Sequence, residues 1–460
     1  MHADTNATHA DFDAYADGHA DHSRMHLVTQ DVIEDDTPPE RPLAAAMARA
    51  MRPFTADELE NAQGAHPHAF MAGDAGLFPI GEVAVVAAPG REGKTFALMA
   101  IAAAYARGKR LHGLTPVPDQ QAIIYSAEDD RVQYARKLAA LRWKHGEVTD
   151  GATWWEHIIV PDLESPELVE WRELVKVMDR RPCAGPAVNA IINALQPSMN
   201  SSVPPGLLIF ETASTLNEAD EDNAGLKVLV GALKKIAKAL DVAVVLVHHT
   251  SQAAGSNLST LSIGTADIRG ATALVYNARQ CFLLVNLGSD DNPHPDADAR
   301  TLLRKMVSPG VPTRVSALIC LDSSKALDPP PIYLRWISTP YGPALEEITP
   351  PASLSGLRWR KVLAALNGKR AEVREDAKGA KEQAKVAEAV AAVRKLNSKD
   401  VPASAKQVSL AAGHTKAWAK PYLDLAEEQG LVTTSMAKIA NTGSDTVVYH
   451  AKQWADGDSE

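Results

Sequence analysis

Short apolar runs alternate with longer helical stretches along the middle of the chain. The runs predict strands at 82–87, 121–126, 157–160, 206–211, 242–248, 280–286, 301–306, 315–321 and 331–337. Helices are expected among them, including 94–107, 129–144, 166–179 and 223–240. Strands that alternate with helices favour an α/β fold with a mainly parallel central sheet covered on both faces. The later strands lack intervening helices, so we expect them to extend this sheet in antiparallel fashion.

The regions outside this pattern differ in composition. Residues 1–40 are rich in Asp, Ala and His with almost no large apolar side chains, which predicts a disordered acidic tail. Residues 41–80 are interpreted as a helical lead-in, within an α/β domain that spans 41–340. Prolines and then a Lys- and Ala-rich stretch indicate a linker and helical segment at 341–400. We assign no role to the segment 161–205 of this domain.

Residues 401–453 form a further compact pattern. A short helix is expected to end at Gly413, and a second to span 414–429. Strand-like stretches follow at 430–434 and 446–450, joined by an Asn/Gly/Ser-rich turn. Helix, turn, helix and β-ribbon in this order are similar to a small winged helix-turn-helix domain.

Three polar residues open the second helix of this module, where contact with phosphates or bases is expected. They are Thr415, Lys416 and Lys420. A winged helix can equally bind another protein. The local charge favours DNA, because 355–452 carries 17 Lys/Arg against ten Asp/Glu, a local net of +7.

The charge of the whole chain hides this asymmetry. The 460 residues carry a formal net charge of −10, which alone argues against a nucleic-acid partner. Residues 1–42 contribute ten Asp/Glu against two Arg, a local net of −8. An acidic tail at one end and a basic module at the other indicate a polyanion as partner of the basic end.

Composition also indicates the cellular compartment of the protein. The cysteines, Cys183, Cys281 and Cys320, are too widely spaced for a disulfide framework or a zinc pattern. No apolar run approaches the length that a membrane span needs, and the N-terminus has no secretory signal pattern. We therefore expect a cytoplasmic protein without a membrane partner.

The strongest chemical motif follows the first strand. The stretch Ala88–Thr95, APGREGKT, runs into an Ala-rich helix, which is the setting of a loop that binds nucleotide phosphates. Its glycines let the backbone wrap around phosphates, Lys94 adds a charge, and Thr95 reaches Mg²⁺. The residues expected to hold the nucleotide are Pro89, Gly90, Arg91, Glu92, Gly93, Lys94, Thr95 and Phe96. The alternative is a chance match, and Ala88 stands where the motif has its first glycine.

Acidic residues follow two other strands, where ligand sites of open α/β sheets lie. Glu128 opens an acidic run and is expected to orient or deprotonate the attacking water, whereas Asp129 and Asp130 better suit capping of the next helix. Glu211 ends an apolar strand in the place of a Mg²⁺-binding acid, although the usual residue is Asp.

Two histidines and an arginine complete the candidate set. His248 and His249 follow a buried strand and are interpreted as a sensor of the γ-phosphate, or alternatively as satisfied surface histidines. Arg269 follows a Gly/Ser/Thr-rich loop at 251–266. It is either a surface cation or a finger that reaches the nucleotide of a neighbouring subunit.

Together these motifs resemble RecA-fold ATPases, and most closely the RepA-type hexameric replicative helicases of plasmids and mobile elements. The resemblance spans about 190 residues in the family's order. It is carried by APGREGKT (88–95), YSAEDD (125–130), LLIFETAS (207–214), VVLVHHT (244–250) and DIRGATALV (267–275).

The resemblance implies a homohexameric ring, with ATP and Mg²⁺ as cofactors, that moves on single-stranded DNA and also contacts duplex DNA. Lys94, Glu128, His248, His249 and Arg269 would be catalytic, and Thr95 and Glu211 would serve the metal. Loop 251–266 would line the central channel, and Lys305 would face a neighbouring site. Two other functions stay open: a RecA-like ATPase of recombination, repair or helicase loading, and a nucleotide-gated DNA-binding switch with little turnover.

Overall fold

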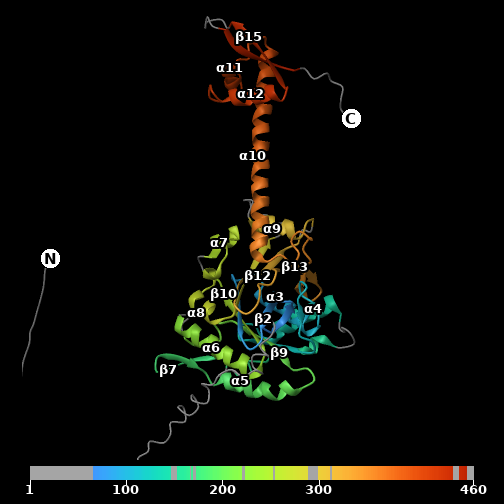
Figure 1. Ribbon diagram of the computed structural model, residues 1–460, viewed down its shortest axis with the longest axis vertical. Coiled ribbons are helices and arrows are strands. Elements are labelled where there is room, and N and C mark those ends of the chain that lie inside the picture. The colour runs from blue at the N-terminus through green and yellow to red at the C-terminus, as the bar shows by residue number, and fades with distance from the viewer. Residues whose placement is uncertain are drawn as a thin grey trace, which may run out of the picture. The chain divides into compact units, whose positions relative to one another are not determined.

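The computed structural model describes residues 66–146, 153–165, 167–168, 172–219, 223–251, 254–288, 299–310, 313–438 and 445–452 (Figure 1). These residues fall within one compact unit, Ala65–Glu460. The acidic tail expected at 1–40 and the first part of the lead-in, to residue 65, lie outside the described residues. So does most of the turn expected before residue 445.

A nine-stranded sheet forms the centre, in the order β14-β13-β12-β11-β3-β10-β9-β5-β6. The strands from β6 to β11 pair in parallel, and β12, β13 and β14 pair antiparallel. Their bounds are β3 Val83–Ala88, β5 Gln121–Ser126, β6 Ile158–Ile159, β9 Pro205–Glu211, β10 Ala243–His249, β11 Gln280–Gly288, β12 Val315–Ser323, β13 Ile332–Thr339 and β14 Gly342–Glu347. The predicted α/β fold with a mainly parallel sheet is confirmed, including its antiparallel extension.

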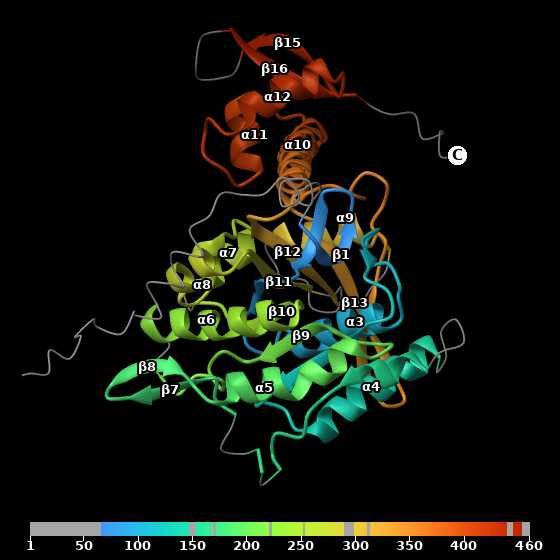
Figure 2. The same ribbon diagram turned by 60° about the horizontal axis from the view of Figure 1, so that its bottom comes forward.

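The parallel strands are apolar on both sides because both faces of the sheet are covered. All seven residues of β9 are buried. Leu208 and Phe210 pack on one face with α5 (Ala187–Leu195) and α6 (Asn223–Leu240). Leu207 and Ile209 pack on the other face with α3 (Lys94–Ala106) and α4 (Arg131–His145). Figure 2 shows α5 and α6 side by side on their face.

Three interpretations of local structure were wrong. Part of the helical lead-in is the hairpin β1 (His68–Ala72) and β2 (Ala75–Pro79), which pairs with β4 (Thr115–Pro116). The strand expected at 301–306 is helix α9 (Ala299–Val307). Its apolar residues recur at helical spacing, since Leu303 and Val307 are both buried.

The helix expected at 166–179 is the third error. In the described part of that range, β7 (Val175–Met178) pairs with β8 (Arg181–Ala184). Asp179 and Arg180, between the strands, both adopt positive φ, 49° and 60°. This backbone suits a two-residue hairpin turn, because it matches the twist of the flanking strands.

The sheet also extends past the boundary that we expected at residue 340. β14 is the edge strand of the nine-stranded sheet, although it lies in the segment interpreted as a linker. The prolines that suggested a linker are compatible with this position. Pro343 pairs with Ser338 on an edge strand, where the missing N–H of proline is tolerated.

Helix α10 (Trp359–Asn397) connects two separate cores over 39 residues. Trp359, Val362 and Leu366 are buried in the core on the α6 face of the sheet. At its other end, Val390 and Val393 are buried in a core of the C-terminal module. The helical segment expected at this place is therefore a single continuous helix.

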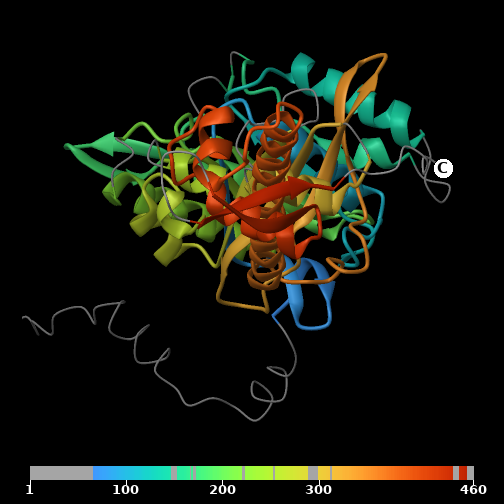
Figure 3. The same ribbon diagram turned by 90° about the horizontal axis from the view of Figure 1, so that it is seen from above.

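The C-terminal module contains α11 (Ala405–Ala411), α12 (Ala419–Glu428) and the hairpin β15 (Val432–Lys438) and β16 (Asp445–Ala451). Figure 3 looks onto this hairpin. Helix, helix and hairpin follow in the expected order, but α12 begins five residues later than expected. The backbone N–H of Ala419 donates to the Ser409 hydroxyl, 2.8 Å away, and this contact lies at the start of α12.

The remaining described elements are short. They are η1 (Trp154–His157), η3 (Gln196–Asn200), α7 (Ala254–Thr260), η4 (Thr265–Asp267) and α8 (Ala271–Asn277). Among the helices that the structure describes, none combines the length and the apolarity of a membrane-spanning segment.

Candidate functional site

The loop that we expect to bind phosphate connects the central strand β3 to helix α3. Arg91 and Gly93 adopt positive φ, 63° and 85°, and turn the chain back toward the helix. Ala88 is not among the residues with positive φ, because it is the last residue of β3. The departure from glycine at this position therefore requires no strained backbone.

Lys94, the first residue of α3, lies at the centre of the polar groups. It is 8% exposed, and its Nζ lies 3.2 Å from Nδ1 of His249. The strand register explains this contact, because β10 pairs with β3 so that His249 lies opposite Ala88. Burial lowers the pKa of Lys94, and the charges of Glu128, Glu211 and Glu92 oppose this shift.

Glu211 and Thr95, the two residues expected to serve Mg²⁺, are in direct contact. The Thr95 hydroxyl donates to Glu211 Oε1 at 2.6 Å. Glu211 is only 3% exposed, and burial raises its pKa, while the hydrogen bonds from Thr95 and Tyr134 act in the opposite direction. The presence of Glu where Asp is usual therefore does not prevent contact with the Thr95 hydroxyl.

Tyr134 is a member of this site that sequence reasoning missed. It lies on α4, is 1% exposed, and donates its hydroxyl to Glu211 Oε2. Burial and the neighbouring Glu211 charge raise the pKa of Tyr134 well above its usual value. In the sequence it is indistinguishable from a core aromatic residue. The one available signal is its place in the first turns of the helix that follows the acidic run.

The acidic run itself separates into three roles. Asp130 caps α4, since its carboxylate accepts from the backbone N–H of Gln133 at 2.7 Å. Asp129 forms an ion pair of 2.6 Å with Lys137. Glu128 is exposed, and its backbone N–H donates to the Ser126 hydroxyl at 3.3 Å. The capping alternative thus applies to Asp130 and leaves the Glu128 carboxylate facing solvent near Lys94.

The two histidines are placed differently. His248 is fully buried and its Nε2 lies 3.0 Å from the backbone carbonyl oxygen of Arg269, to which it donates as a neutral imidazole. Burial, together with neighbouring His249, lowers its pKa to about 4. His249 is half-buried and faces Lys94. Of the pair, only His249 lies against the phosphate loop.

Arg269 is tied to the same strand by its backbone. Its N–H donates to the carbonyl oxygen of His249 at 3.1 Å, while its side chain is exposed. The preceding segment was expected to be a loop, but its described part contains α7 and η4. Buried Asp267 holds it together by accepting from Asn257 Nδ2 and from Gly264 N, both at 2.8 Å.

A second group of residues that the sequence did not indicate covers the phosphate loop. Arg314 lies 3.3 Å from Glu92, and its guanidinium lies over the ring of Trp336, 4.9 Å from the centroid. Trp336 also packs on Phe96. A Cβ added to Gly93 would lie 2.5 Å from the Trp336 ring, so this position requires glycine for close packing as well as for its backbone conformation.

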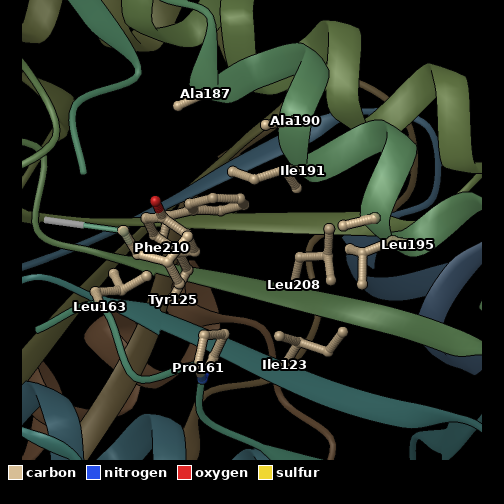
Figure 4. A pocket seen from close by; sticks show the side chains of 12 residues that line it. Ile123, Tyr125, Pro161, Leu163, Ala187, Ala190, Ile191, Leu195, Leu208 and Phe210 are labelled. Atoms are coloured by element: carbon tan, nitrogen blue, oxygen red, sulfur yellow. The ribbon is translucent and has the colours of Figure 1, made fainter. Parts of the chain in front are cut away.

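An apolar hollow of about 260 Å³ lies on the α5 face of the sheet (Figure 4). Side chains of β5 and β9, including Tyr125 and Phe210, face α5 across it. Residues of the segment 161–205 supply much of its lining. It belongs to the opposite face from α3 and α4, and its apolar lining offers nothing that would bind phosphate.

The oxygen atoms of Thr95 and Glu211 limit which metal ion this site could hold. Among the described residues, no three His, Cys, Asp or Glu side chains come together as a metal cluster. Thr95 and Glu211 alone fit Mg²⁺, which commonly takes one or two protein oxygens and completes its shell with phosphate and water. They would not fit a structural zinc site, which needs four protein ligands.

A protein-family model matches the part of the chain that contains this site. Residues 48–255 match the family model described as an AAA domain. This range includes the phosphate loop, Glu128, Glu211 and both histidines, but not Arg269. No curated protein matched the chain.

The chain is also similar to solved structures. One match is a DnaB-like replicative helicase whose structure was determined with its interactions with primase, at 13% sequence identity and a TM-score of 0.39. The match covers 66% of this chain and 70% of that chain.

Proposed function

We propose that the protein is a Mg²⁺-dependent ATPase that drives movement on DNA. The observation that supports this most is the contact between Thr95 and Glu211 beside buried Lys94. Lys94 and Thr95 follow β3, and Glu211 ends β9. The ends of β5 and β10 place Glu128 and His249 at the same edge of the sheet. Ligands of open α/β sheets bind at this edge.

In this proposal the backbone N–H groups of residues 89–96 hold the β- and γ-phosphates at the start of α3. Lys94 adds a positive charge that burial leaves poorly screened. Thr95 and Glu211 hold the metal, which neutralises charge that develops on the phosphates during transfer. Tyr134 fixes the orientation of Glu211 through its second oxygen.

Glu128 is the proposed group that orients or deprotonates water. Its carboxylate is neither a helix cap nor part of the Asp129–Lys137 pair, and its charge acts on both Lys94 and Glu211. His249 senses the γ-phosphate through Lys94, which it contacts. His248 links this strand to Arg269, because it donates to that residue's backbone.

Arg269 is proposed to act on the nucleotide of a neighbouring subunit. Its exposed side chain extends from a backbone that is hydrogen-bonded to both histidines, so a contact across an interface would be transmitted to Lys94. A contact of this kind between subunits is compatible with a homohexameric ring. We propose that this ring moves on single-stranded DNA in replication of a plasmid or other mobile element. The segment 251–266 would then line the channel.

The C-terminal module is proposed to be a winged helix that binds DNA. Thr415 and Lys416 are exposed in the turn before α12. Lys420 is exposed on α12 and forms an ion pair of 2.9 Å with Asp424, which DNA phosphates would have to displace. Docking of another protein is the alternative use of this surface.

The test is ATP hydrolysis with and without single-stranded DNA, for the wild type and for Lys94→Ala. We expect hydrolysis that DNA stimulates and that Lys94→Ala abolishes. A rate that is independent of DNA and equal in the two proteins would refute the proposal. Electron micrographs with an ATP analogue and single-stranded DNA distinguish a ring from the filament of a recombination ATPase.

A further inference from the structure

Helix α10 carries five cationic side chains along one side. Arg370, Arg374, Lys378, Lys381 and Lys385 follow one another at intervals of four, four, three and four residues. Residues at these intervals lie above one another on a helix. They form a continuous row, called the basic stripe below, that extends over about 22 Å at 1.5 Å per residue.

The acidic residues of the same turns lie elsewhere on the helix. At 100° per residue, the basic stripe occupies an arc of about 80°, whereas Glu372, Glu375, Asp376 and Glu382 lie outside it. Only one member of the stripe pairs with any of them, Lys378 with Glu375 at 3.8 Å. Both partners of that pair are more than 70% exposed, so the pair is weak.

The stripe is also accessible. Arg374, Lys378, Lys381 and Lys385 are exposed, and Arg370 is half-buried. They belong to the middle turns of α10, the helix labelled in Figure 1. Within the described residues, no acidic partner contacts Arg370, Arg374 or Lys381. Charges of one sign that lie close together on a helix repel one another and destabilise it. A bound polyanion would reduce this repulsion.

Both ends of the stripe continue into neighbouring elements. At one end, Lys305 of α9 lines a hollow of about 250 Å³ together with Arg370 and Arg374. At the other end, Lys385 donates to the Tyr422 hydroxyl at 3.1 Å and lies over its ring. A second hollow, of about 500 Å³, runs from Arg374 to Tyr422 along the stripe.

We propose that the basic stripe binds the phosphodiester backbone of a nucleic acid. This deepens the DNA-binding part of the proposed function and rests on it. A length of about 22 Å matches roughly six phosphates along one strand of a duplex. Among the charged residues that line the second hollow, Glu382 is the one acid beside four cations of the stripe. Such a regularly spaced excess of positive charge matches a uniformly charged polymer better than a protein surface, where both signs are interspersed.

The stripe also adds contacts that the turn before α12 cannot supply. Tyr422, at the end of the stripe, packs on Trp418, and Trp418 stacks on His414 with ring centroids 4.0 Å apart. These rings border the turn that contains Thr415 and Lys416. The stripe would therefore hold the backbone of the same nucleic acid that the turn contacts.

The experiment compares two triple variants of the full chain with the wild type. The first is Arg374→Gln, Lys378→Gln and Lys381→Gln, within the stripe. The matched control is Lys361→Gln, Lys369→Gln and Arg394→Gln, which removes the same charge from exposed positions of α10 outside the stripe. Fluorescence anisotropy without nucleotide measures binding to a single-stranded oligonucleotide and to a duplex of the same sequence, over a series of salt concentrations.

We expect the stripe variant to bind at least about tenfold more weakly at ~0.1 M salt, with a salt slope smaller by about 2 to 3. The control should stay within about twofold of the wild type, and thermal unfolding of both variants should match the wild type. If the stripe variant loses more affinity for one of the two DNA forms, that form is the one that the stripe binds. Equal affinities of the two variants would overturn this proposal alone, whereas a wild type that binds neither DNA form would also overturn the proposed function.

An acidic polypeptide is the competing occupant of the stripe. Polyglutamate added as competitor tests it in the same assay. If polyglutamate displaces DNA only at much higher charge concentration than unlabelled DNA does, the nucleic-acid assignment is supported. Displacement at equal charge concentration would overturn it and indicate a docking surface for an acidic protein.

Discussion

The hydroxyl of Thr95 donates a hydrogen bond of 2.6 Å to Oε1 of Glu211, across 116 positions of sequence. Thr95 is the second residue of α3, the helix after the phosphate loop, and Glu211 ends β9, two strands away from β3 in the sheet. A threonine and a buried carboxylate in contact here are arranged to share one ligand, which in the proposed function is Mg²⁺. The carboxylate is already oriented by the time a ligand arrives, because Tyr134 holds its other oxygen.

Glu211→Gln is expected to lower ATP turnover by about 100-fold or more while nucleotide binding persists. The amide keeps the shape of the side chain but removes the charge that attracts the metal, and a loss of 100-fold corresponds to about 2.7 kcal/mol in the barrier. Steady-state hydrolysis and binding of a fluorescent ATP analogue measure the two effects. Thr95→Ser, which keeps a hydroxyl, is the control that should retain most activity. Unchanged turnover in Glu211→Gln would remove Glu211 from the site.

Tyr134→Phe is expected to lower the free energy of unfolding by about 1–3 kcal/mol, because it leaves a buried carboxylate oxygen without its donor. It should also lower turnover, since Glu211 loses one of the two contacts that orient it. The matched control is Tyr105→Phe, which removes a second buried tyrosine hydroxyl, one that donates to Gln120 instead. Urea unfolding and hydrolysis distinguish the two: only Tyr134→Phe should affect turnover. If both variants hydrolyse ATP as the wild type does, Tyr134 is merely a core residue.

Stability is expected to fall as pH drops from 6.5 toward 4. Burial lowers the pKa of four histidines to about 4: His68, His112, His145 and His248. In this window the unfolded chain binds protons that the folded chain does not, so the free energy of unfolding rises with pH. Glu211 and Glu347, whose pKa values burial raises, act in the opposite direction above about 4.5, but the histidines outnumber them.

His248→Asn tests this account at one site. Removal of one such histidine should flatten the pH dependence by at most about 1.4 kcal/mol per pH unit. Urea unfolding at several pH values between 4 and 7 measures the slope for variant and wild type. Identical slopes would mean that His248 is protonated in the folded protein at the same pH as in the unfolded chain.

Short-range patterns predicted the phosphate loop and most of the sheet, because each of these depends on a few consecutive residues. Lys94, Thr95 and Glu211 could be named from sequence, since motif and strand end define them. Tyr134 and Trp336 could not, because their roles arise only when distant elements pack together. The strand prediction for α9 was wrong for another reason. Its apolar residues Leu302, Leu303, Met306 and Val307 suit a strand or a helix, and the length of so short a segment does not distinguish the two.

Gly93→Ala is expected to destabilise the fold by about 1–3 kcal/mol and to weaken nucleotide binding. Alanine would have to adopt the left-handed backbone of Gly93, which is unfavourable for a residue with a Cβ, and the new Cβ would overlap the Trp336 ring. Gly90→Ala is the matched control for stability, because Gly90 has no positive φ and no atom within 4 Å of an added Cβ. Equal unfolding free energies for the two variants would show that the loop rearranges around Trp336 without strain.

Arg269→Ala is expected to abolish hydrolysis, and mixing it with Lys94→Ala is expected to restore part of it. If Arg269 acts on a neighbour's nucleotide, an active interface needs Lys94 from one subunit and Arg269 from the next. Each variant alone has no such interface. In a one-to-one mixture, about a quarter of head-to-tail interfaces combine the two intact residues. Hydrolysis by the mixture, measured after subunits have exchanged, should therefore exceed that of either variant. A mixture that is as inactive as its components, despite exchange shown by fluorescence energy transfer between labelled subunits, would mean that Arg269 does not act across an interface.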